Sequence, residues 1–355
     1  MNSKLLAALL IGGALIAAQA PKPRPAAARP ALPAISPAAL ASHVSFLASD
    51  PLAGRETPSP GLDIAAEYIA SQFRRAGLKP GLDRSYFQTA RVTVIPPDPE
   101  KKKGRRVRLL EDGAGQGEEA RNVIGVLPGS DPALKDTCVL LSAHYDHIGT
   151  AASGDDRIYN GANDNASGVA AVIETAAALA SRRARPRRTV VFIAFFGEEQ
   201  GMLGSRYYAR HPACPLEKTA AHVNLEQVGR TDDTEGPQIA SVTLTGFELS
   251  GLPAVLQAAG NRTAVKVYKR ERAEDKYFLR SDNLPLAQAG VPAHTLAATF
   301  GFPDYHGLDD EWDRLDYRNM ARITRTVMAG VLELANSPGA PEWNPQNPEA
   351  EPYLR

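Results

Sequence analysis

Short apolar strands alternate with helical segments in the second half of the chain, and this alternation constrains the fold more than any other feature. From Thr137 onward, strand-like runs cover residues 138–143, 189–196 and 221–225, and helical runs cover residues 166–180 and 202–210. Alternation of this kind is typical of a parallel sheet whose strands are buried on both faces by helices. The sequence therefore predicts an α/β domain, and it contains no internal repeat and no second core.

The N-terminal region has the organisation of an export signal. Residues 1–20 carry a positive charge near their start, at Lys4, followed by an apolar run over residues 5–18. They end in the small-x-small triplet Ala18-Gln19-Ala20, which is typical of a signal-peptidase site. A membrane anchor is the alternative, but a span needs about 18 or more apolar residues, and this run is shorter. We therefore expect a cleaved signal peptide, a periplasmic or secreted protein, and no stable membrane insertion after cleavage.

The remaining boundaries follow from composition and periodicity. Residues 21–37 are rich in Pro and Ala and are interpreted as a flexible tether. Residues 38–337 form the predicted single domain, with helical spacing at 38–47 and 63–76, and residues 338–355 are assigned to a C-terminal tail. The oppositely charged segments 101–108 and 111–119 are expected to form the two sides of a surface hairpin or loop.

Charge and cysteine content exclude some partners and limit cross-linking. Forty basic residues balance forty acidic ones, so the net charge favours neither a nucleic acid nor an anionic membrane, and no aromatic residues interleave with the charged segments. Two cysteines do not make a disulfide framework. A bridge between Cys138 and Cys214 is possible, but the sequence favours two separate thiols.

Potential metal ligands follow the predicted strands at the points where the strands end. His144 and Asp146 follow the first strand, and the pair Glu198-Glu199 follows the second. The remaining candidates are Asp164 in a Gly-flanked turn, Glu226 at the end of the third strand, and His306 after the apolar run 292–298. Since ligands of such sheets bind at the carboxyl ends of the strands, we expect these side chains to gather at one edge.

Imidazoles and carboxylates without a thiolate suit zinc or a similar ion. One ion would not need so many ligands, whereas a hydrolytic metal pair shares a bridging carboxylate. Asp164 is the natural bridge because its turn lets the backbone come close to the ions. Of the adjacent Glu198 and Glu199, one can bind metal while the other accepts a proton, and Asp146 is placed to fix the tautomer of His144.

Five blocks of the sequence carry a resemblance to a known family. They are His144-Tyr-Asp-His, Gly-Ala-Asn-Asp164-Asn-Ala-Ser-Gly, Phe-Phe-Gly-Glu198-Glu199-Gln-Gly-Met-Leu-Gly-Ser205, Asn224-Leu-Glu226-Gln-Val-Gly and Tyr305-His306-Gly-Leu-Asp-Asp. In this order they resemble the co-catalytic dizinc aminopeptidases, relatives of the secreted bacterial leucyl aminopeptidases. An upstream segment, Phe46 to Glu56, is also similar, so the resemblance covers about residues 40 to 335.

The resemblance implies a three-layer αβα sandwich around a mixed, mainly parallel sheet. It implies two Zn²⁺ ions, one held by His144 and Glu226 and the other by Glu199 and His306, with Asp164 bridging. Glu198 is then the general base. The implied activity is removal of N-terminal residues from peptides with a free N-terminus.

The resemblance leaves a few positions and activities open. Asp146 would orient His144, and Tyr305 either helps to polarise the substrate carbonyl or is a rim aromatic that packs on the site. Glu226 stands where many members have Asp, and Asn283 where a His or Tyr is common. Alternatives on the same fold are a glutaminyl cyclase, which uses one zinc ion, and a glutamate-type carboxypeptidase; a binding protein without catalysis is a further reading.

Overall fold

The computed structural model describes residues 32–82, 84–96, 105–111, 115–270 and 274–354. The predicted signal peptide and residues 21–31 of the predicted tether lie outside this part of the chain. Within it, Leu32–Arg355 forms one compact unit. None of the helices found among these residues combines the length and apolar character that crossing a membrane requires.

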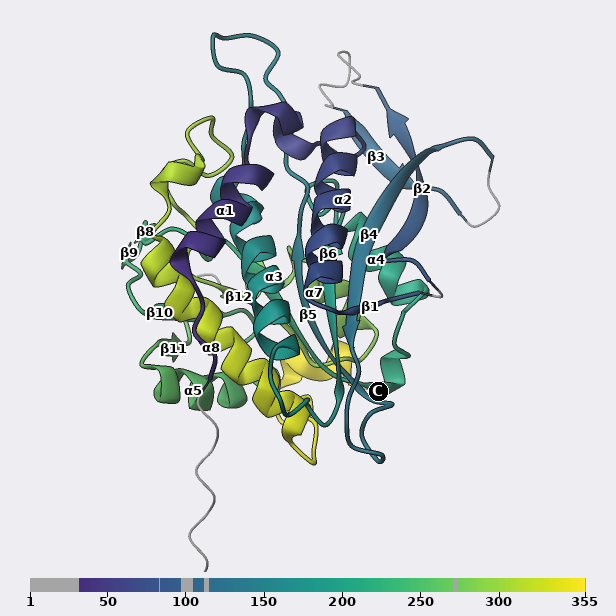
Figure 1. Cartoon of the computed structure of the whole chain (residues 1–355), viewed down its shortest axis with the longest axis vertical. Coiled ribbons are helices and arrows are strands. Elements are labelled where there is room, and N and C mark those ends of the chain that lie inside the picture. Colours follow the sequence, from purple (N-terminus) through teal and green to yellow (C-terminus); the bar gives the residue numbers. More distant parts are fainter. Residues whose placement is uncertain (1–31, 83, 97–104, 112–114, 271–273, 355) are drawn as a thin grey trace, which may run out of the picture. The chain divides into compact units, whose positions relative to one another are not determined.

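The unit is built on one mixed sheet (Figure 1). Its strands lie in the order β11-β10-β12-β7-β5-β6-β4-β2-β3, and β1 pairs with β4. The central strands β12, β7, β5 and β6 run parallel, whereas β4, β2 and β3 pair antiparallel on one side and β10 pairs antiparallel with β12 on the other. The strands are β1 (Lys79–Pro80), β2 (Phe87–Ile95), β3 (Arg106–Leu109), β4 (Glu118–Leu127), β5 (Cys138–His144), β6 (Thr189–Phe195), β7 (Thr219–Glu226), β10 (Ser241–Leu244), β11 (Lys266–Tyr268) and β12 (Ala293–Ala297), with a separate pair β8 (Asp232–Asp233) and β9 (Gly236–Pro237).

Helices cover both faces of the sheet. α1, α2, α3 and α8 lie on one face, where α3 packs on β5 and β7, and α4 and α7 lie on the other (Figure 1). The helices are α1 (Pro37–Leu47), α2 (Pro60–Arg75), α3 (Ser167–Ala180), α4 (Leu203–Arg210), α5 (Leu252–Thr263), α6 (Glu274–Phe278), α7 (Asn283–Gln288) and α8 (Tyr317–Asn336), and the short helical turns are η1 (Asp50–Arg55), η2 (Ala162–Ala166), η3 (Leu216–Lys218), η4 (Trp312–Arg314) and η5 (Pro348–Tyr353). The predicted helical segments correspond to α1, α2, α3 and α4, so the α/β class with a helix-flanked mixed sheet is confirmed.

The two core layers are separated by the alternation of side chains along the central strands. On β5, Val139 and Leu141 join the cluster under α1, α2, α3 and α8, while Leu140 joins the cluster on the opposite face. The same alternation places Phe192 and Ile193 of β6 in different clusters. Since successive side chains of a strand point to opposite faces, an unbroken apolar run supplies both layers.

The expected surface hairpin or loop of charged residues lies partly outside the described residues, which do not include 97–104 and 112–114. Arg106–Leu109 forms β3, which pairs with one edge of β2, and the acidic start of β4 pairs with the other edge of β2. The described parts of the basic and acidic segments therefore lie on opposite sides of β2 rather than against each other, because β2 presents hydrogen-bonding groups along both of its edges.

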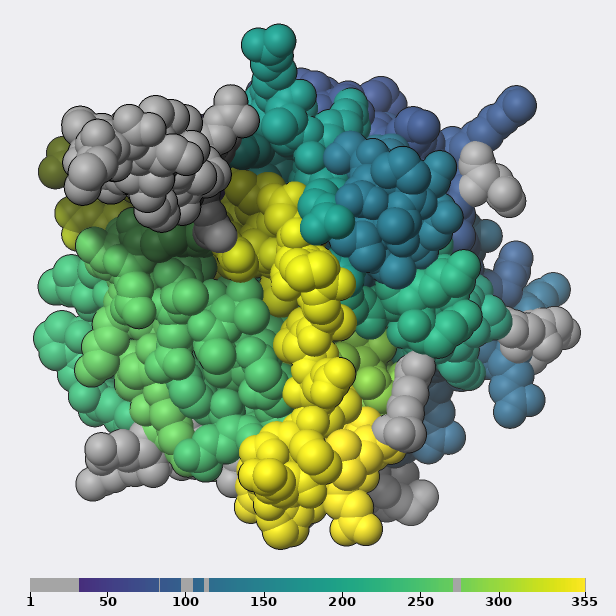
Figure 2. Space-filling view, turned by 90° about the horizontal axis from the view of Figure 1, so that it is seen from below, coloured from purple at the N-terminus to yellow at the C-terminus, as the bar shows by residue number. Residues whose placement is uncertain are grey.

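Residues 338–354 of the assigned C-terminal tail pack against the rest of the domain, and residue 355 lies outside the described residues. Trp343 and Tyr353 are each 7% exposed and contact Phe278 through their rings. Figure 2 shows this segment, in yellow, lying across the surface between segments coloured green and teal. Burial of two large aromatic side chains gives the segment an apolar anchor that its polar and Pro-rich composition does not suggest.

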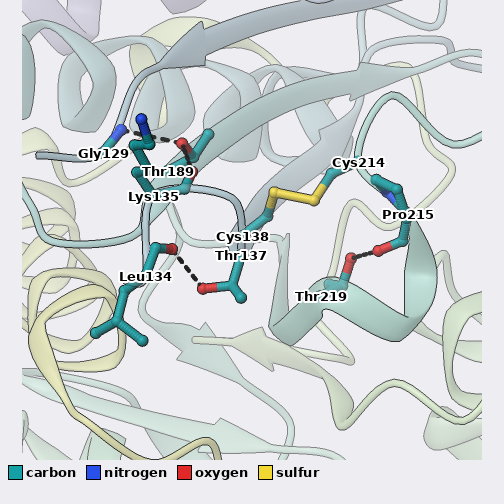
Figure 3. The surroundings of a disulfide bond; sticks show 9 residues. All are labelled: Gly129, Leu134, Lys135, Thr137, Cys138, Thr189, Cys214, Pro215 and Thr219. Carbon is teal, nitrogen blue, oxygen red and sulfur yellow. Dashed lines mark hydrogen bonds between the residues drawn. A yellow bond between two sulfur atoms is a disulfide. The ribbon is translucent and has the colours of Figure 1, made fainter. Parts of the chain in front are cut away.

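Cys138 and Cys214 form a disulfide (Figure 3), so the expectation of two separate thiols was wrong. Cys138 begins β5, and Cys214 lies in the loop between α4 and η3. Their Cα atoms are 6.6 Å apart, within the range that a disulfide spans. The fold brings the two together because the segment after α4 leads into β7, whose first residue, Thr219, pairs with Cys138 of β5.

Candidate metal centre

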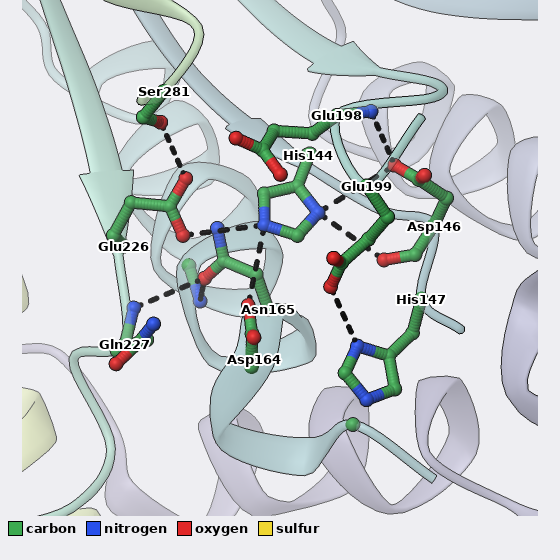
Figure 4. A network of polar contacts seen from close by, with 12 residues as sticks. His144, Asp146, His147, Asp164, Asn165, Glu198, Glu199, Glu226, Gln227 and Ser281 are labelled. Carbon is green, nitrogen blue, oxygen red and sulfur yellow. Dashed lines mark hydrogen bonds and ion pairs between the residues drawn. The ribbon is translucent and has the colours of Figure 1, made fainter. Parts of the chain in front are cut away.

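The predicted site residues meet at the carboxyl end of the parallel strands. His144 and Glu226 are the last residues of β5 and β7, Glu198 and Glu199 follow β6, and Asp164 lies in η2 between β5 and α3. His306 lies in the loop that follows β12. Figure 4 shows the side chains of His144, Asp164, Glu198, Glu199 and Glu226 close together, as the parallel strand order requires.

Asp164 faces two separate groups of donors with its two oxygens. Its Oδ1 lies 3.3 Å from Nε2 of His144, and that nitrogen lies 3.2 Å from Oε2 of Glu226. Its Oδ2 lies 3.2 Å from Nε2 of His306, which is also 3.2 Å from Oε1 of Glu199. One carboxylate therefore joins two clusters, which is the arrangement of a bridging ligand.

The donor spacing fits zinc. A tetrahedral ion with bonds of about 2.0 Å has neighbouring ligand atoms roughly 3.3 Å apart, close to the four separations around Asp164. Nε2 of His306 is buried and makes no hydrogen bond within the described residues, although two carboxylate oxygens lie 3.2 Å away. This nitrogen points between the oxygens, where an ion would lie.

The buried carboxylates and imidazoles of the site shift one another's pKa values. Burial acts to raise the pKa of Glu199, but interactions with His147 and His306 outweigh it and hold the pKa at about 2. Burial alone would lower the pKa of His306. The carboxylates of Asp164 and Glu199 outweigh burial and raise that pKa to about 10. The pKa of Asp164 lies below its usual range because contacts with His144 and His306 outweigh burial. The carboxylates are thus held in the anionic form that binds metal.

Glu198 is distinguished from its neighbour by its environment. Burial, together with the negative charges of Glu226 and Glu199, raises the pKa of Glu198 well above its usual value, although His144 opposes the shift. Its main-chain N–H donates to Oδ1 of Asp146 at 3.1 Å. The Glu198 side chain lines the cavity beside His144 (Figure 4), so it can exchange a proton with a bound molecule.

Asp146 contacts His144, and Tyr305 contacts His306. Nδ1 of His144 lies 3.2 Å from the main-chain oxygen of Asp146 and 3.5 Å from its Oδ1, so the main-chain oxygen is the nearer acceptor for the ring N–H. The ring of Tyr305 stacks on that of His306, with centroids 4.1 Å apart, and is 40% exposed. Tyr305 therefore packs on the site and also reaches the cavity.

A cavity of about 490 Å³ opens over the two clusters. Besides the candidate ligands it is lined by a stacked aromatic pair, Tyr277 and Phe300, whose centroids are 4.3 Å apart, and by Met202. Among the described residues that line it, Arg280 is the single arginine. The cavity has the size of a small-molecule or peptide-end site.

Sequence reasoning missed several residues that shape the centre. Nδ1 of His147 lies 3.0 Å from Oε1 of Glu199, and Ser281 donates to Oε1 of Glu226 at 2.7 Å. Asp310 accepts the main-chain N–H groups of Asn163 and Asp164 at 2.9 and 3.0 Å, which fixes the turn that carries Asp164. His147 and Asp310 stand inside the blocks quoted above, which was the available signal.

Arg55 was missed as well, although it lies in the upstream segment that carries part of the resemblance. Its fully buried guanidinium donates to main-chain oxygens of Tyr145, Asn160 and Gly161 at 2.8, 2.7 and 3.0 Å, and also to that of Leu47. Burial lowers the pKa of Arg55 to about 10. Arg55 therefore links the residue that follows His144 to the residues that precede the Asp164 turn.

Comparison with curated proteins gives relatives of modest identity. The chain is 27% identical over 202 residues to leupeptin-inactivating enzyme 1 of Streptomyces exfoliatus, covering 55% of this chain and 39% of that protein. It is 26% identical over 343 residues to a probable zinc metalloprotease of Pyricularia oryzae, covering 83% of this chain and 62% of that protein. The chain thus spans less than two thirds of the length of either relative.

Solved structures share the fold at low identity. A zinc aminopeptidase from Bacillus subtilis superposes with a TM-score of 0.65 at 17% identity, covering 87% of this chain and 97% of that one. A glutaminyl cyclase from Bacteroides thetaiotaomicron gives a TM-score of 0.60 at 18% identity, covering 85% of this chain and 99% of that one. Two different activities therefore occur on this fold.

The family model with the description peptidase family M28 matches residues 122–331. The matched segment begins within β4, ends within α8 and contains every predicted metal ligand. The matched segment covers more than half of the chain, and it contains the five blocks on which the sequence resemblance rested. This protein belongs to peptidase family M28.

Proposed function

We propose that the chain is an exported, zinc-dependent aminopeptidase that hydrolyses the N-terminal peptide bond of peptides. The observation that carries the proposal is the division of the Asp164 carboxylate between two donor clusters, beside the free carboxyl of Glu198. Zinc bound at these clusters supplies Lewis acidity for the substrate carbonyl and makes water a stronger acid.

Glu198 is proposed to move the proton. Its carboxylate takes the proton from the attacking water and delivers it to the leaving amine, which requires one group to act as base and then as acid. The raised pKa of Glu198 suits this exchange, and the hydrogen bond from its N–H to Asp146 holds the residue beside His144. Ser281 and Asp310 hold Glu226 and the Asp164 turn in place.

Tyr305 is proposed to contact the substrate at the mouth of the cavity. Its stacking on His306 fixes the ring, and burial beside the carboxylates raises the pKa of its phenol. The hydroxyl therefore stays protonated at neutral pH and can donate a hydrogen bond to a carbonyl oxygen.

Export is proposed from residues 1–20 and is supported by the Cys138–Cys214 disulfide, because such bonds persist in oxidising compartments. N-terminal sequencing of protein from the periplasmic fraction and from the medium tests it. We expect a mature chain that begins after Ala20. An intact N-terminus on cytoplasmic protein would contradict export.

The activity is tested with matched peptides, one with a free and one with an acetylated N-terminus, analysed by mass spectrometry. Stepwise loss of N-terminal residues from the free peptide alone is expected. Trimming from the C-terminus would instead indicate a carboxypeptidase, for which Arg280 is a candidate contact. Cyclised N-terminal Gln would indicate a glutaminyl cyclase, which is the second candidate function because a glutaminyl cyclase shares this fold.

The role of the base is tested by Glu198→Gln. The variant should bind zinc as the wild type does and lose about 10²- to 10⁴-fold in kcat, the usual contribution of a general base. Glu217→Gln, at an exposed glutamate in η3, is the matched control and should keep full activity. Wild-type turnover by Glu198→Gln would remove Glu198 from the mechanism.

A further inference from the structure

The two donor clusters around Asp164 contain unequal numbers of protein groups. One consists of His144, Asp164 and Glu226, and the other of His147, Asp164, Glu199 and His306, with the ligand atoms of each cluster all within 4.8 Å of one another. The second cluster contains His147, which the five-ligand pattern does not include. This difference deepens the proposed function, because it concerns the metal centre on which that function rests.

His147 is directed at the position where an ion would lie. Its Nδ1 lies 3.0 Å from Oε1 of Glu199, and the same oxygen lies 3.2 Å from Nε2 of His306. Two imidazole nitrogens thus converge on one carboxylate oxygen, at separations close to the roughly 3.3 Å edge of a tetrahedral zinc site. The rings of His147 and His306 meet edge to face, with centroids 5.5 Å apart.

The surroundings of His147 hold the ring in this orientation. Its side chain is fully buried, and its Nε2 makes no hydrogen bond among the described residues, so Glu199 is its polar contact there. Gly161, with φ of +59°, lies against the ring, and a Cβ at that position would stand 2.5 Å from ring atoms. The backbone N–H of His147 donates to the main-chain oxygen of Arg55 at 3.3 Å. The site is therefore built around an imidazole.

We propose that His147 is a sixth protein ligand, which binds through Nδ1 and makes the two metal positions unequal. The position of His147, Asp164, Glu199 and His306 has the four protein donors of a closed zinc site, whereas the position of His144, Asp164 and Glu226 has the three of an open one. The closed position fills first. The open position, beside Glu198 (Figure 4), receives water and substrate.

The test counts the imidazoles bound to zinc. The full-length protein is freed of metal, given one equivalent of zinc and examined by X-ray absorption. Two imidazoles per zinc are expected in the wild type, since His147 and His306 bind the first ion. One imidazole overturns the proposal, because without His147 each position contains a single histidine.

The variant His147→Asn tests whether His147 is a metal ligand or only a hydrogen-bond donor to Glu199. The Asn amide nitrogen takes the place of Nδ1 and can still donate to Glu199, but it is a poor zinc ligand. We expect one imidazole per zinc in this variant and a loss of zinc affinity greater than about 100-fold, beyond what loss of a hydrogen bond to a ligand causes. Two imidazoles in the variant would overturn the proposal. His211→Asn, at a histidine that does not line the cavity, should bind zinc as the wild type does.

A crystal structure of the zinc-loaded wild type keeps the proposal testable if His147→Asn does not fold. A distance of about 2.0–2.1 Å between zinc and Nδ1 of His147 is expected for a ligand, and a hydrogen-bonded separation from Glu199 with no zinc contact would overturn the assignment. Neither measurement depends on cleavage. Two imidazoles without loss of N-terminal residues would remove the proposed function alone, and one imidazole with such loss would remove this inference alone.

Discussion

Removal of the Cys138–Cys214 disulfide should lower the stability of this protein by several kcal/mol. The two residues are 76 positions apart, and in the chain-entropy model a cross-link over such a loop reduces the entropy of the unfolded chain by an amount worth about 4.5 kcal/mol at 25 °C. With an unfolding entropy of about 2.1 cal/mol/K per residue, a unit the size of Leu32–Arg355 would lose about 7 °C in Tm. Replacement of both buried sulfurs by Cys138→Ala/Cys214→Ala adds a packing loss of about 1.5 kcal/mol, comparable to two methylene groups.

Three samples separate the cross-link from the packing. Oxidised wild type, reduced wild type and the double alanine variant are unfolded in urea at one fixed free zinc concentration, with a phosphine reductant because a dithiol would compete for the metal. Reduced wild type should lie about 4 kcal/mol below the oxidised protein, and the double variant lower still. If reduced wild type unfolded within about 1 kcal/mol of the oxidised protein, the loop-entropy reasoning would be refuted.

Three further predictions concern Arg55, the metal centre and a buried histidine of β12, His294. Arg55→Met should cost about 3–5 kcal/mol in urea unfolding, because it leaves buried main-chain oxygens such as those of Asn160 and Gly161 without donors; a cost below 1 kcal/mol would show that water or a shifted chain replaces the guanidinium. Chelation of zinc should lower Tm, since the clustered carboxylates lose their counter-charge, and re-addition should raise stability by about 1.4 kcal/mol per tenfold excess over Kd; a Tm independent of zinc would contradict a metal centre. Burial lowers the pKa of His294 to about 4, below the unfolded value of about 6.5, so the folded protein should lose stability as pH falls from about 6.5 to 4. His294→Gln should flatten that loss by up to about 3 kcal/mol in metal-free protein, and an unchanged slope would assign the acid sensitivity to other groups.

Much of the candidate centre could be predicted because its proposed ligands follow from local sequence and strand direction. His144, Glu199 and Glu226 each stand at the carboxyl end of an apolar strand, and parallel strands joined by helices bring those ends to one edge. The Gly-flanked turn then places Asp164 between them. The unbroken apolar character of β5 and β6 likewise indicates burial on both faces, so the class of fold could be inferred without coordinates.

Tertiary packing decided the features that join residues far apart in sequence. Nothing local to Cys138 or Cys214 indicates that the loop after α4 returns to the start of β5, and the aromatic anchors Trp343 and Tyr353 give no periodic signal in a Pro-rich segment.

His147 and Arg55 illustrate the same limit within the centre. A histidine three positions after a candidate ligand can point toward that ligand or away from it, and a lone arginine in a sequence does not indicate its partners. Only the packing of the loops directs His147 at Glu199 and surrounds Arg55 with main-chain oxygens. The sequence alone determined which strands end at the centre, because local runs of apolar residues indicate buried strands and the helices between them indicate parallel strand direction. The tertiary structure decided which side chains complete it, because those contacts depend on how distant loops pack.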